Sequence, residues 1–179
     1  MISKCVIVIY SASYTLTPYL IKVLAMSSQY AQKTADQLAV AQALYQYAAG
    51  IDLRDSALLA SALTHDAVSD FGLAAAKVGF EYPVLQGRDS IVQALMTSLS
   101  PFDTTHSVNN PRVAIDGDKA VLDALVEAQH VLKTDHARHY LMKNRYDVWL
   151  VKQEETWLIQ HIIVDNVWRA GDPSVMAGV

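Results

Sequence analysis

The stretch that decides the fold class is THSVNNPRVAIDGDKAVLDALVEAQHVL, residues 105–132. Its two halves flank Gly117–Asp118, a residue pair typical of a tight turn. In the second half, apolar and polar residues alternate. One face carries Ala120, Leu122, Ala124, Val126, Ala128 and His130. A period of two predicts a strand with one buried face, so the stretch predicts a long antiparallel hairpin.

Similar patterns extend outward from this hairpin. Residues 137–153 and 155–170 predict a second hairpin around Gln153–Glu154. Upstream, helices are expected at 34–50, at 55–63 and at 90–99. The first begins at Thr34 or Asp36 and ends at Gly50, and the third starts at residues 87–89 and stops before Pro101. Shorter strands are expected at 65–72 and 76–86. Helices followed by long antiparallel strands predict an α+β fold, with the helices packed on one face of a curved sheet.

Length and composition restrict the class of protein. The chain has 179 residues, of which 52% are apolar and 18% charged, so one well-buried core is expected. The net charge of −4 argues against nucleic acid as a partner, because phosphate binding needs a basic face. Cys5 is the only cysteine, so neither an internal disulfide nor a cysteine-based zinc site is expected.

The N-terminal segment differs from the rest of the chain. Residues 1–25 contain a short apolar run, but no apolar stretch reaches the length that spans a membrane. We expect an N-terminal extension over residues 1–25 and a single domain over residues 26–179. A cytoplasmic protein without a membrane partner is the corresponding expectation.

The stretch QYAAGIDLRD, residues 46–55, brings Asp52 to the end of the first predicted helix. His106 lies early in a predicted strand. If the two met, the carboxylate would hold the imidazole in one tautomer, and the imidazole could then act as a general base or acid near neutral pH. Two alternatives stay open at this point: Asp52 could simply end a helix, and His106 could be a hydrogen-bonded strand residue. If Asp52 points inward, Arg54 and Asp55 are expected to face solvent.

The order of several short motifs resembles that of a known family. These are ALYQYAAGIDLRD, HDAV, GRDSI, TTHSVNNPRVAIDGDKAVLDA and ETWLIQHIIV. Together they resemble the SnoaL-like group of the NTF2-like superfamily over residues 34–170, a group that includes scytalone dehydratase, a bile-acid dehydratase and hexachlorocyclohexane dehydrochlorinase. The resemblance implies a cone-shaped, cystatin-like α+β fold. Three N-terminal helices would pack on a strongly curved antiparallel or mixed sheet around a deep apolar pocket.

The resemblance also implies roles for particular residues. In the lyases of this group an Asp at the end of the first helix pairs with a His on a central strand, which matches Asp52 and His106. A Tyr about one turn before that Asp is represented by Tyr47, so Asp52, His106 and Tyr47 are the expected catalytic residues. Many relatives carry a pocket-facing Arg after the Trp of the last strand. Here LIQHII follows Trp157, and His161 is the nearest polar substitute.

The remaining histidines and tryptophans have less specific patterns. His130 shares a strand face with Ala and Val, so it is expected either to line the pocket or to be a satisfied core residue. We assign His130, His161 and Trp157 to substrate binding. His130, His136 and His139 straddle a predicted turn, so neither a metal site nor another cofactor is expected.

Three functions agree with these patterns. The first is a cofactor-independent, dehydratase-like lyase or isomerase that acts on a small hydrophobic, ring-bearing molecule. The second is a pocket protein that binds such a molecule without chemistry. The third is an assembly subunit, because the small subunits of ring-hydroxylating dioxygenases share this fold. A homodimer is expected, since members of the superfamily often pair through their sheets.

Overall fold

The computed structural model describes residues 17–176. The chain divides into two compact units, residues 1–35 and residues 36–179. Among the described residues, every buried side chain belongs to the second unit. Most of the expected N-terminal extension, residues 1–16, lies outside the described residues, and a domain start at Met26 stays a prediction. In the described part of the chain, no helix is long and apolar enough to cross a membrane.

The first helix is longer than predicted. Helix α1 spans Pro18–Leu53, and Pro suits the first turn of a helix because its φ angle is already helical. The predicted end at Gly50 is also wrong, since Gly50 lies inside the last turn. A Cβ atom at Gly50 would lie 2.5 Å from the backbone nitrogen of Leu59, so this glycine permits close packing instead of ending the helix.

The other two predicted helices are confirmed. Helix α2 spans Ser56–Ser61, and the side chain of Asp55 caps it by accepting a hydrogen bond from the Leu58 N–H at 2.9 Å. Helix α4 spans Arg88–Ser98 and begins directly after Gly87. Together with the second half of α1, these helices supply apolar side chains that pack in the core of the second unit.

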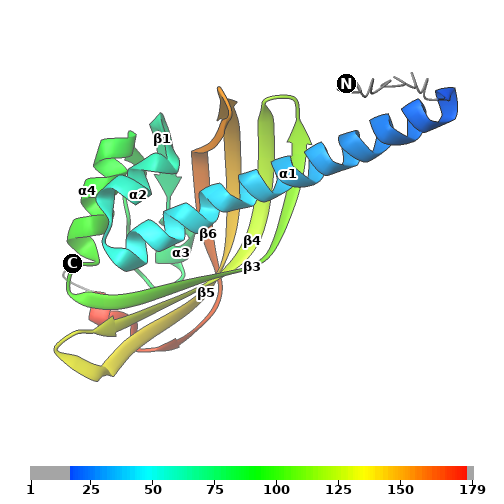
Figure 1. The fold of residues 1–179 in the computed structure, drawn as a ribbon. Helices are drawn as coiled ribbons and strands as arrows, with labels where there is room; N and C mark the ends of the chain where they lie inside the picture. The colour runs from blue at the N-terminus through cyan, green and yellow to red at the C-terminus, as the bar shows by residue number, and fades with distance from the viewer. Residues whose placement is uncertain (1–16, 177–179) are drawn as a thin grey trace, which may run out of the picture. The chain divides into compact units, whose positions relative to one another are not determined.

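Six strands form one sheet in the order β2-β1-β6-β5-β4-β3. Their bounds are β1 Leu63–Asp70, β2 Leu85–Gln86, β3 Phe102–Asp116, β4 Lys119–Leu132, β5 Asp135–Gln153 and β6 Thr156–Gly171. Neighbouring strands are antiparallel except β1 and β6, which are parallel. The long strands of both predicted hairpins curve along their length, and the predicted α+β fold with helices on a mixed sheet is confirmed (Figure 1).

The predicted strand over residues 76–86 is mostly wrong. The chain forms helix α3 over Gly72–Ala76, and only β2 remains as strand. The run LAAA favours a helix, and Gly79 then adopts a φ of 80° that interrupts regular structure. Pro83 has no N–H to donate to a strand ladder. The segment between α3 and β2 therefore has no regular secondary structure.

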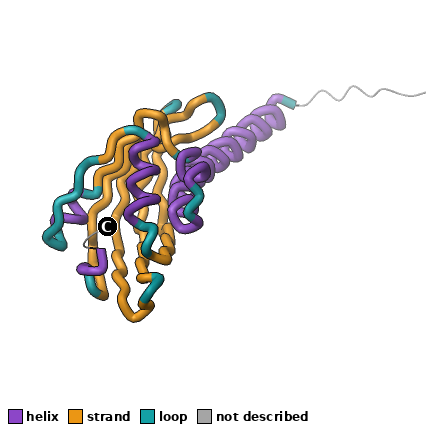
Figure 2. The backbone as a smooth tube through the Cα atoms, turned by 90° about the vertical axis from the view of Figure 1, so that its left-hand side faces the viewer, coloured by secondary structure: helices purple, strands orange, loops and turns teal. Residues whose placement is uncertain are grey.

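The predicted inward face of β4 is confirmed, because all six residues from Ala120 to His130 at alternate positions are buried. Helices of the second unit cover this face of the sheet (Figure 2). The last element, the short 3-10 helix η1 at Pro173–Met176, follows β6. The core thus lies between the sheet and the helices, and side chains do not fill all of the space between them.

Candidate active site

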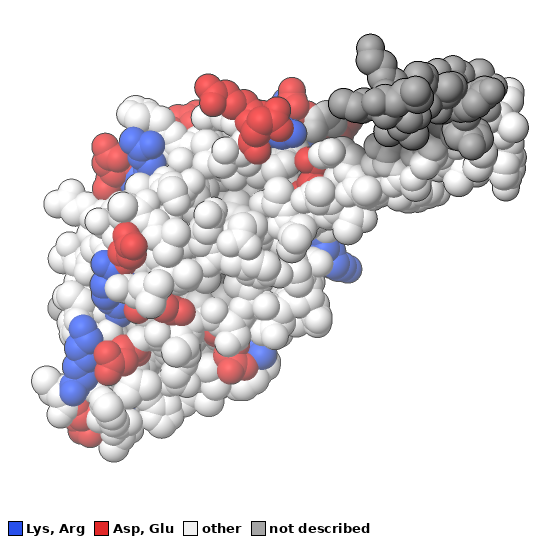
Figure 3. Space-filling model, viewed as in Figure 1, with Lys and Arg blue, Asp and Glu red and all other residues white. Residues whose placement is uncertain are grey.

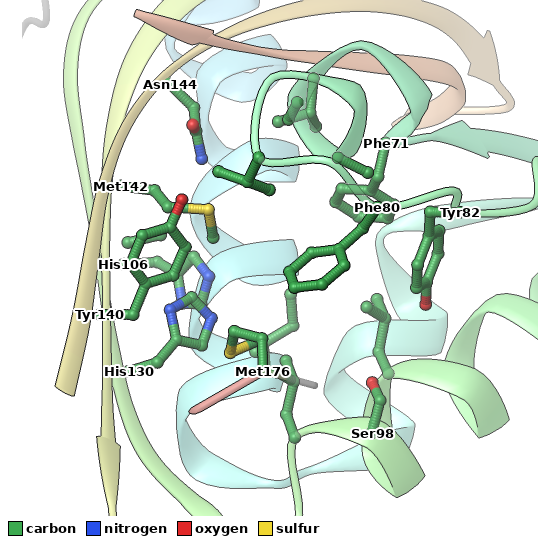
Figure 4. A pocket seen from close by; sticks show the side chains of 18 of the residues that line it. Phe71, Phe80, Tyr82, Ser98, His106, His130, Tyr140, Met142, Asn144 and Met176 are labelled. Atoms are coloured by element: carbon green, nitrogen blue, oxygen red, sulfur yellow. The ribbon is translucent and has the colours of Figure 1, made fainter. Parts of the chain in front are cut away.

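A cavity of about 490 Å³ lies within the second unit. The sheet strands β3, β4 and β5 contribute His106, His130, Tyr140, Met142, Asn144 and Tyr146 to its lining. The helices and the segments directly before and after them contribute apolar side chains, including Phe71, Val78, Phe80, Leu95, Leu99 and Met176. Both histidines and the Asn144 amide come from the sheet (Figure 4). The polar atoms of a ligand would therefore be expected to face the sheet.

Asp52 and His106 lie in direct contact, as predicted. The Nδ1 atom of His106 is 2.6 Å from Oδ1 of Asp52, and the His106 backbone N–H donates to Oδ2 at 2.6 Å. The last turn of α1 supplies the carboxylate, and the fifth residue of β3 supplies the imidazole. His106 lines the cavity, whereas the Asp52 side chain lies behind it. The pair therefore presents an imidazole to the cavity.

The Asp52 carboxylate has a third donor, the Thr104 hydroxyl, at 2.9 Å from Oδ1. Burial raises the pKa of Asp52, but the hydrogen bonds from His106 and Thr104 and the attraction of the His106 charge outweigh burial and leave this pKa below its usual value. An ionised carboxylate only accepts, so a neutral His106 carries its hydrogen on Nδ1. The Nε2 atom then holds the lone pair that can take a proton.

His130 lies beside His106 in a different environment. The two rings meet edge to face with centroids 5.8 Å apart, and Phe102 contacts His130 in the same way at 6.1 Å. Burial, with a smaller contribution from the nearby His106 charge, lowers the pKa of His130 to about 3. Its Nδ1 atom has no hydrogen-bond partner among residues 17–176. His130 is thus a neutral imidazole that lines the cavity, in agreement with the first of its two expected positions.

Tyr47 is buried but is not among the residues that line the cavity. Burial raises the pKa of its hydroxyl far above the usual range, and the nearby Ser69 side chain offsets only part of this effect. Tyr146 lines the cavity instead, and burial likewise raises the pKa of its hydroxyl. The tyrosines that line the cavity therefore come from β5 (Tyr140 and Tyr146) and from the segment after α3 (Tyr82), not from α1.

His161 and Trp157 are also not brought to the cavity. Trp157 is buried in the core. His161 stacks on Trp149 with ring centroids 5.1 Å apart. A register shift between β5 and β6 falls between Ile159 and His161, so the extra residue moves His161 to the opposite face of the sheet from Ile159. The expected alternation of side chains fails at this bulge, and with it the predicted position of His161.

Arg54 corrects another expectation. Its guanidinium is not left to solvent but donates hydrogen bonds to Thr104 Oγ1 at 2.9 Å, to the Leu99 carbonyl at 2.7 Å and to the Phe102 carbonyl at 2.6 Å. Asp55 is exposed, as expected, and caps α2. The contact between Arg54 and Thr104 places a positive charge directly behind the Asp52–His106 pair.

Sequence reasoning missed several residues that line the cavity. Tyr140, Asn144 and Tyr146 occupy alternate positions of β5 and share a face with buried Val148 and Leu150. That alternation was a usable signal, because a polar Asn on a core-facing position is unusual unless it has partners. The amide of Asn144 accepts a hydrogen bond from the Asn166 Nδ2 atom at 2.9 Å. Phe71, directly before α3, and Phe80 and Tyr82, after α3, carry no such signal, since they lie outside regular helices and strands.

Charged groups of both signs are mixed on the face drawn in Figure 3. The expectation that nucleic acid is not a partner stays a prediction. Within residues 17–176, no three His, Cys, Asp or Glu side chains are grouped as they would be to hold a metal ion. The expectation of a site without a cofactor likewise stays a prediction.

The fold and the site define a class: α+β proteins in which helices and a curved sheet enclose an apolar pocket with an Asp–His pair at its wall. Residues 32–163 match the SnoaL-like domain. The chain belongs to the SnoaL-like family, as its motifs suggested. It is 30% identical over 148 residues to "Terrestric acid biosynthesis cluster protein E" of Penicillium crustosum, covering 79% of this chain and 89% of that protein.

Solved structures share the fold at lower identity. The Kfla4162 protein of Kribbella flavida matches with a TM-score of 0.72 and 21% identity, over 82% of this chain and 99% of that one. A hexachlorocyclohexane dehydrochlorinase of Novosphingobium barchaimii matches with a TM-score of 0.64 and 17% identity, over 82% and 94% of the two chains. At these identities the likeness is one of fold, so the reaction has to be argued from the site.

Proposed function

We propose that this protein is a cofactor-independent lyase or isomerase that acts on a small hydrophobic, ring-bearing substrate. One observation carries the proposal: the imidazole of His106, held by the Asp52 carboxylate at 2.6 Å, lines a cavity of about 490 Å³. A cavity of this size and apolar lining suits a compact organic molecule. The imidazole is the group that such a molecule would meet.

The proposed reaction begins with proton transfer to Nε2 of His106. The C–H bond beside a substrate carbonyl breaks, and its electron pair forms an enolate. In a lyase, that electron pair then forms a carbon–carbon double bond as a leaving group departs from the next carbon. In an isomerase, His106 returns the proton to a different carbon. Asp52 stabilises the imidazolium in both cases, and a positioned base of this kind contributes on the order of 10²–10⁴ in rate.

Donors on the sheet side of the cavity would steady the developing negative charge. The neutral ring of His130, the Asn144 amide and the Tyr140 hydroxyl are on this side (Figure 4). Preorganised donors in a site that excludes water stabilise an oxyanion more than water does. We place the electrophilic role with these three residues, in preference to Tyr47 and His161, which do not line the cavity.

The similarities found for this chain support small-molecule chemistry. One structural neighbour is named as a dehydrochlorinase, which is an elimination enzyme. The relative from Penicillium crustosum is named as a protein of the terrestric acid biosynthesis cluster. The first name agrees with an elimination reaction and the second with small-molecule biosynthesis, and neither identifies the substrate of this chain.

The base assignment is tested by solvent exchange. A panel of mono- and bicyclic ketones is incubated in D₂O with the protein, and deuterium incorporation above the buffer background is followed by NMR. His106→Ala is expected to lower the exchange rate at least about 100-fold, because the proton acceptor is lost. The control is His65→Ala, which removes an exposed histidine. Exchange that persists at the wild-type rate in His106→Ala would reject His106 as the base.

The lining of the cavity also favours a second candidate, a non-catalytic binding protein. Phe71, Phe80, Met142 and Met176 give the cavity an apolar, adaptable surface that retains hydrophobic molecules without chemistry. For this function we expect ketones from the panel to bind without exchange. Binding should then tolerate Asp52→Asn, whereas the enzyme should lose most of its exchange activity in the same variant.

A further inference from the structure

Arg54 occupies a backbone position that ordinarily suits glycine. It follows the last residue of α1 and has a φ of 56°, in the left-handed region that few residues other than Gly, Asn and Asp adopt. The backbone N–H of Asp55 donates to the Gly50 carbonyl at 2.9 Å, which closes the end of the helix. A glycine would satisfy this geometry without strain. The arginine side chain therefore requires an explanation of its own.

The guanidinium joins three elements. Its Nη2 atom donates to the carbonyls of Leu99, after α4, and Phe102, at the start of β3. Its Nη1 atom donates to the Ile51 carbonyl in α1 and to Thr104 Oγ1 in β3. All four contacts are within the second unit, and they converge at the point where the Asp52 carboxylate meets β3.

These contacts impose a direction on the hydrogen bonds. A guanidinium has donors only, so the Thr104 oxygen must accept from Arg54. The single hydrogen of the Thr104 hydroxyl is then directed to Oδ1 of Asp52, at 2.9 Å. Thr104 is buried, so water does not compete readily for either partner. The chain of donors runs from Arg54 through Thr104 to Asp52, which receives the His106 Nδ1–H on the same oxygen.

We propose that Arg54 and Thr104 are positioning residues that orient the Asp52 carboxylate and thereby hold His106 in the Nδ1–H tautomer, with Nε2 directed at the substrate. As a statement about catalysis, this inference rests on the acid–base function proposed above. As a statement about hydrogen-bond direction, it depends only on the contacts among these four residues. Arg54 and Thr104 do not line the cavity, so neither is assigned a contact with substrate.

The test is a titration that needs no turnover. The Asp52 carboxyl is followed by ¹³C NMR and the His106 ring by ¹⁵N NMR, in the wild type and in Thr104→Val, which keeps the shape of the side chain but removes the hydroxyl. The titratable and charged groups that act on or around Asp52 are His106, His130, Arg54 and Tyr146. Since these stay in place, a shift reports the loss of the Thr104 donor.

Thr104→Val is expected to move the Asp52 titration to higher pH, because the ionised carboxylate loses a donor. The His106 nitrogens should then report a mixture of tautomers in place of one. Thr104→Ser, which restores a hydroxyl, should return both signals toward the wild type. The matched control is Thr105→Val on the same strand, since Thr105 is exposed and should change neither signal.

Arg54 is tested by two further substitutions. Arg54→Lys keeps the charge but cannot reach all four acceptors, so it should reproduce the tautomer mixture of Thr104→Val. Arg54→Gly suits the backbone but removes the guanidinium. If Arg54 only ended the helix, Arg54→Gly would melt at or above the wild-type temperature and leave the Asp52 titration unchanged. That result, or an unchanged titration in Thr104→Val, would overturn the proposal.

The two proposals fail separately. If ketone exchange never depends on His106 while the titrations shift as expected, the hydrogen-bond direction stands and the enzymatic function does not. If exchange depends on His106 while the titrations stay unchanged, the proposed enzymatic function is supported and the positioning role of Arg54 and Thr104 is rejected. Should both hold, Thr104→Val is expected to lower the exchange rate on the order of tenfold, with little change in the ketone concentration needed for half-saturation.

Discussion

At the scale of single residues, His106 and His130 show how surroundings separate two identical side chains. Their rings are in edge-to-face contact on the same side of the cavity. His106 has a carboxylate 2.6 Å from Nδ1, whereas His130 has no hydrogen-bond partner for its Nδ1 among the described residues. The first can carry a charge next to its counter-ion, while burial keeps the second neutral. The two histidines are therefore suited to different tasks in one site.

The lowered pKa of His130 predicts an acid dependence of stability. Its folded pKa is about 3 and its ordinary value is 6.5, so the unfolded chain binds a proton between these values that the folded chain does not. The contribution of neutral His130 to the free energy of unfolding is complete above pH 6.5 and declines as the pH falls toward 3. The decline approaches about 1.4 kcal/mol per pH unit.

Urea unfolding at a series of pH values between 7 and 4 measures this dependence. In His130→Leu, the free energy of unfolding should fall less steeply with decreasing pH, because the group that takes up a proton on unfolding is gone. His65→Leu serves as the control, since His65 is exposed. An identical slope in His130→Leu and the wild type would show that the folded protein accommodates a protonated His130.

At the scale of elements, the close contact between α1 and α2 depends on Gly50. A Cβ atom at this position would lie 2.5 Å from the Leu59 nitrogen and 2.7 Å from its Cα, and backbone atoms cannot move aside as a flexible side chain can. We expect Gly50→Ala to lower the free energy of unfolding by about 1–3 kcal/mol through overpacking. It would also displace the end of α1 that carries Asp52.

The melting temperature and the exchange activity of Gly50→Ala test this expectation together. The comparison is Gln42→Ala, an exposed position of the same helix, where a substitution to Ala should change stability by less than about 0.5 kcal/mol. A Gly50→Ala protein as stable as the wild type would mean that α2 can shift without cost.

At the scale of the whole molecule, the expected homodimer can be related to an exposed apolar surface of the sheet. Val121 and Trp149 are paired across β4 and β5, and 44% and 38% of their surfaces are exposed. Trp149 also carries the stacked ring of His161. Exposed apolar groups that cluster in this way are typical of association surfaces. We therefore predict that two copies of the chain pair through this face.

Analytical ultracentrifugation checks the prediction. The wild type should sediment with the mass of two chains, and Trp149→Glu should shift it toward one chain, because pairing would bury an unpaired charge. Leu73→Glu is the matched control: it adds the same charge at an exposed apolar position of α3. A monomeric wild type, or equal effects of the two variants, would contradict pairing through this face.

Local patterns in the sequence were sufficient for much of this protein. The alternation in residues 119–132 determined the buried face of β4, and the turn residues determined the two hairpins. The order of short motifs determined the family, and through it the contact between Asp52 and His106. The buried face and the hairpins follow from local rules, because strand alternation and turn geometry depend on residues close together in the chain. The contact between Asp52 and His106 joins residues 54 apart and was predicted only through the family resemblance.

Only the tertiary structure decided the rest. The bulge before His161 places its side chain on the opposite face from the predicted one. The close approach of Leu59 explains why a glycine lies inside α1 at position 50. Arg54, expected to face solvent, instead donates to four acceptors on three elements. The cavity lining from the segment after α3 and the neutral state of His130 also come from packing. The deciding partner of Gly50 lies in the next helix, and the other partners lie mainly on elements further away along the chain. The free energy of burial and hydrogen bonding then determines where the side chain lies, and the periodicity of the sequence does not reveal it.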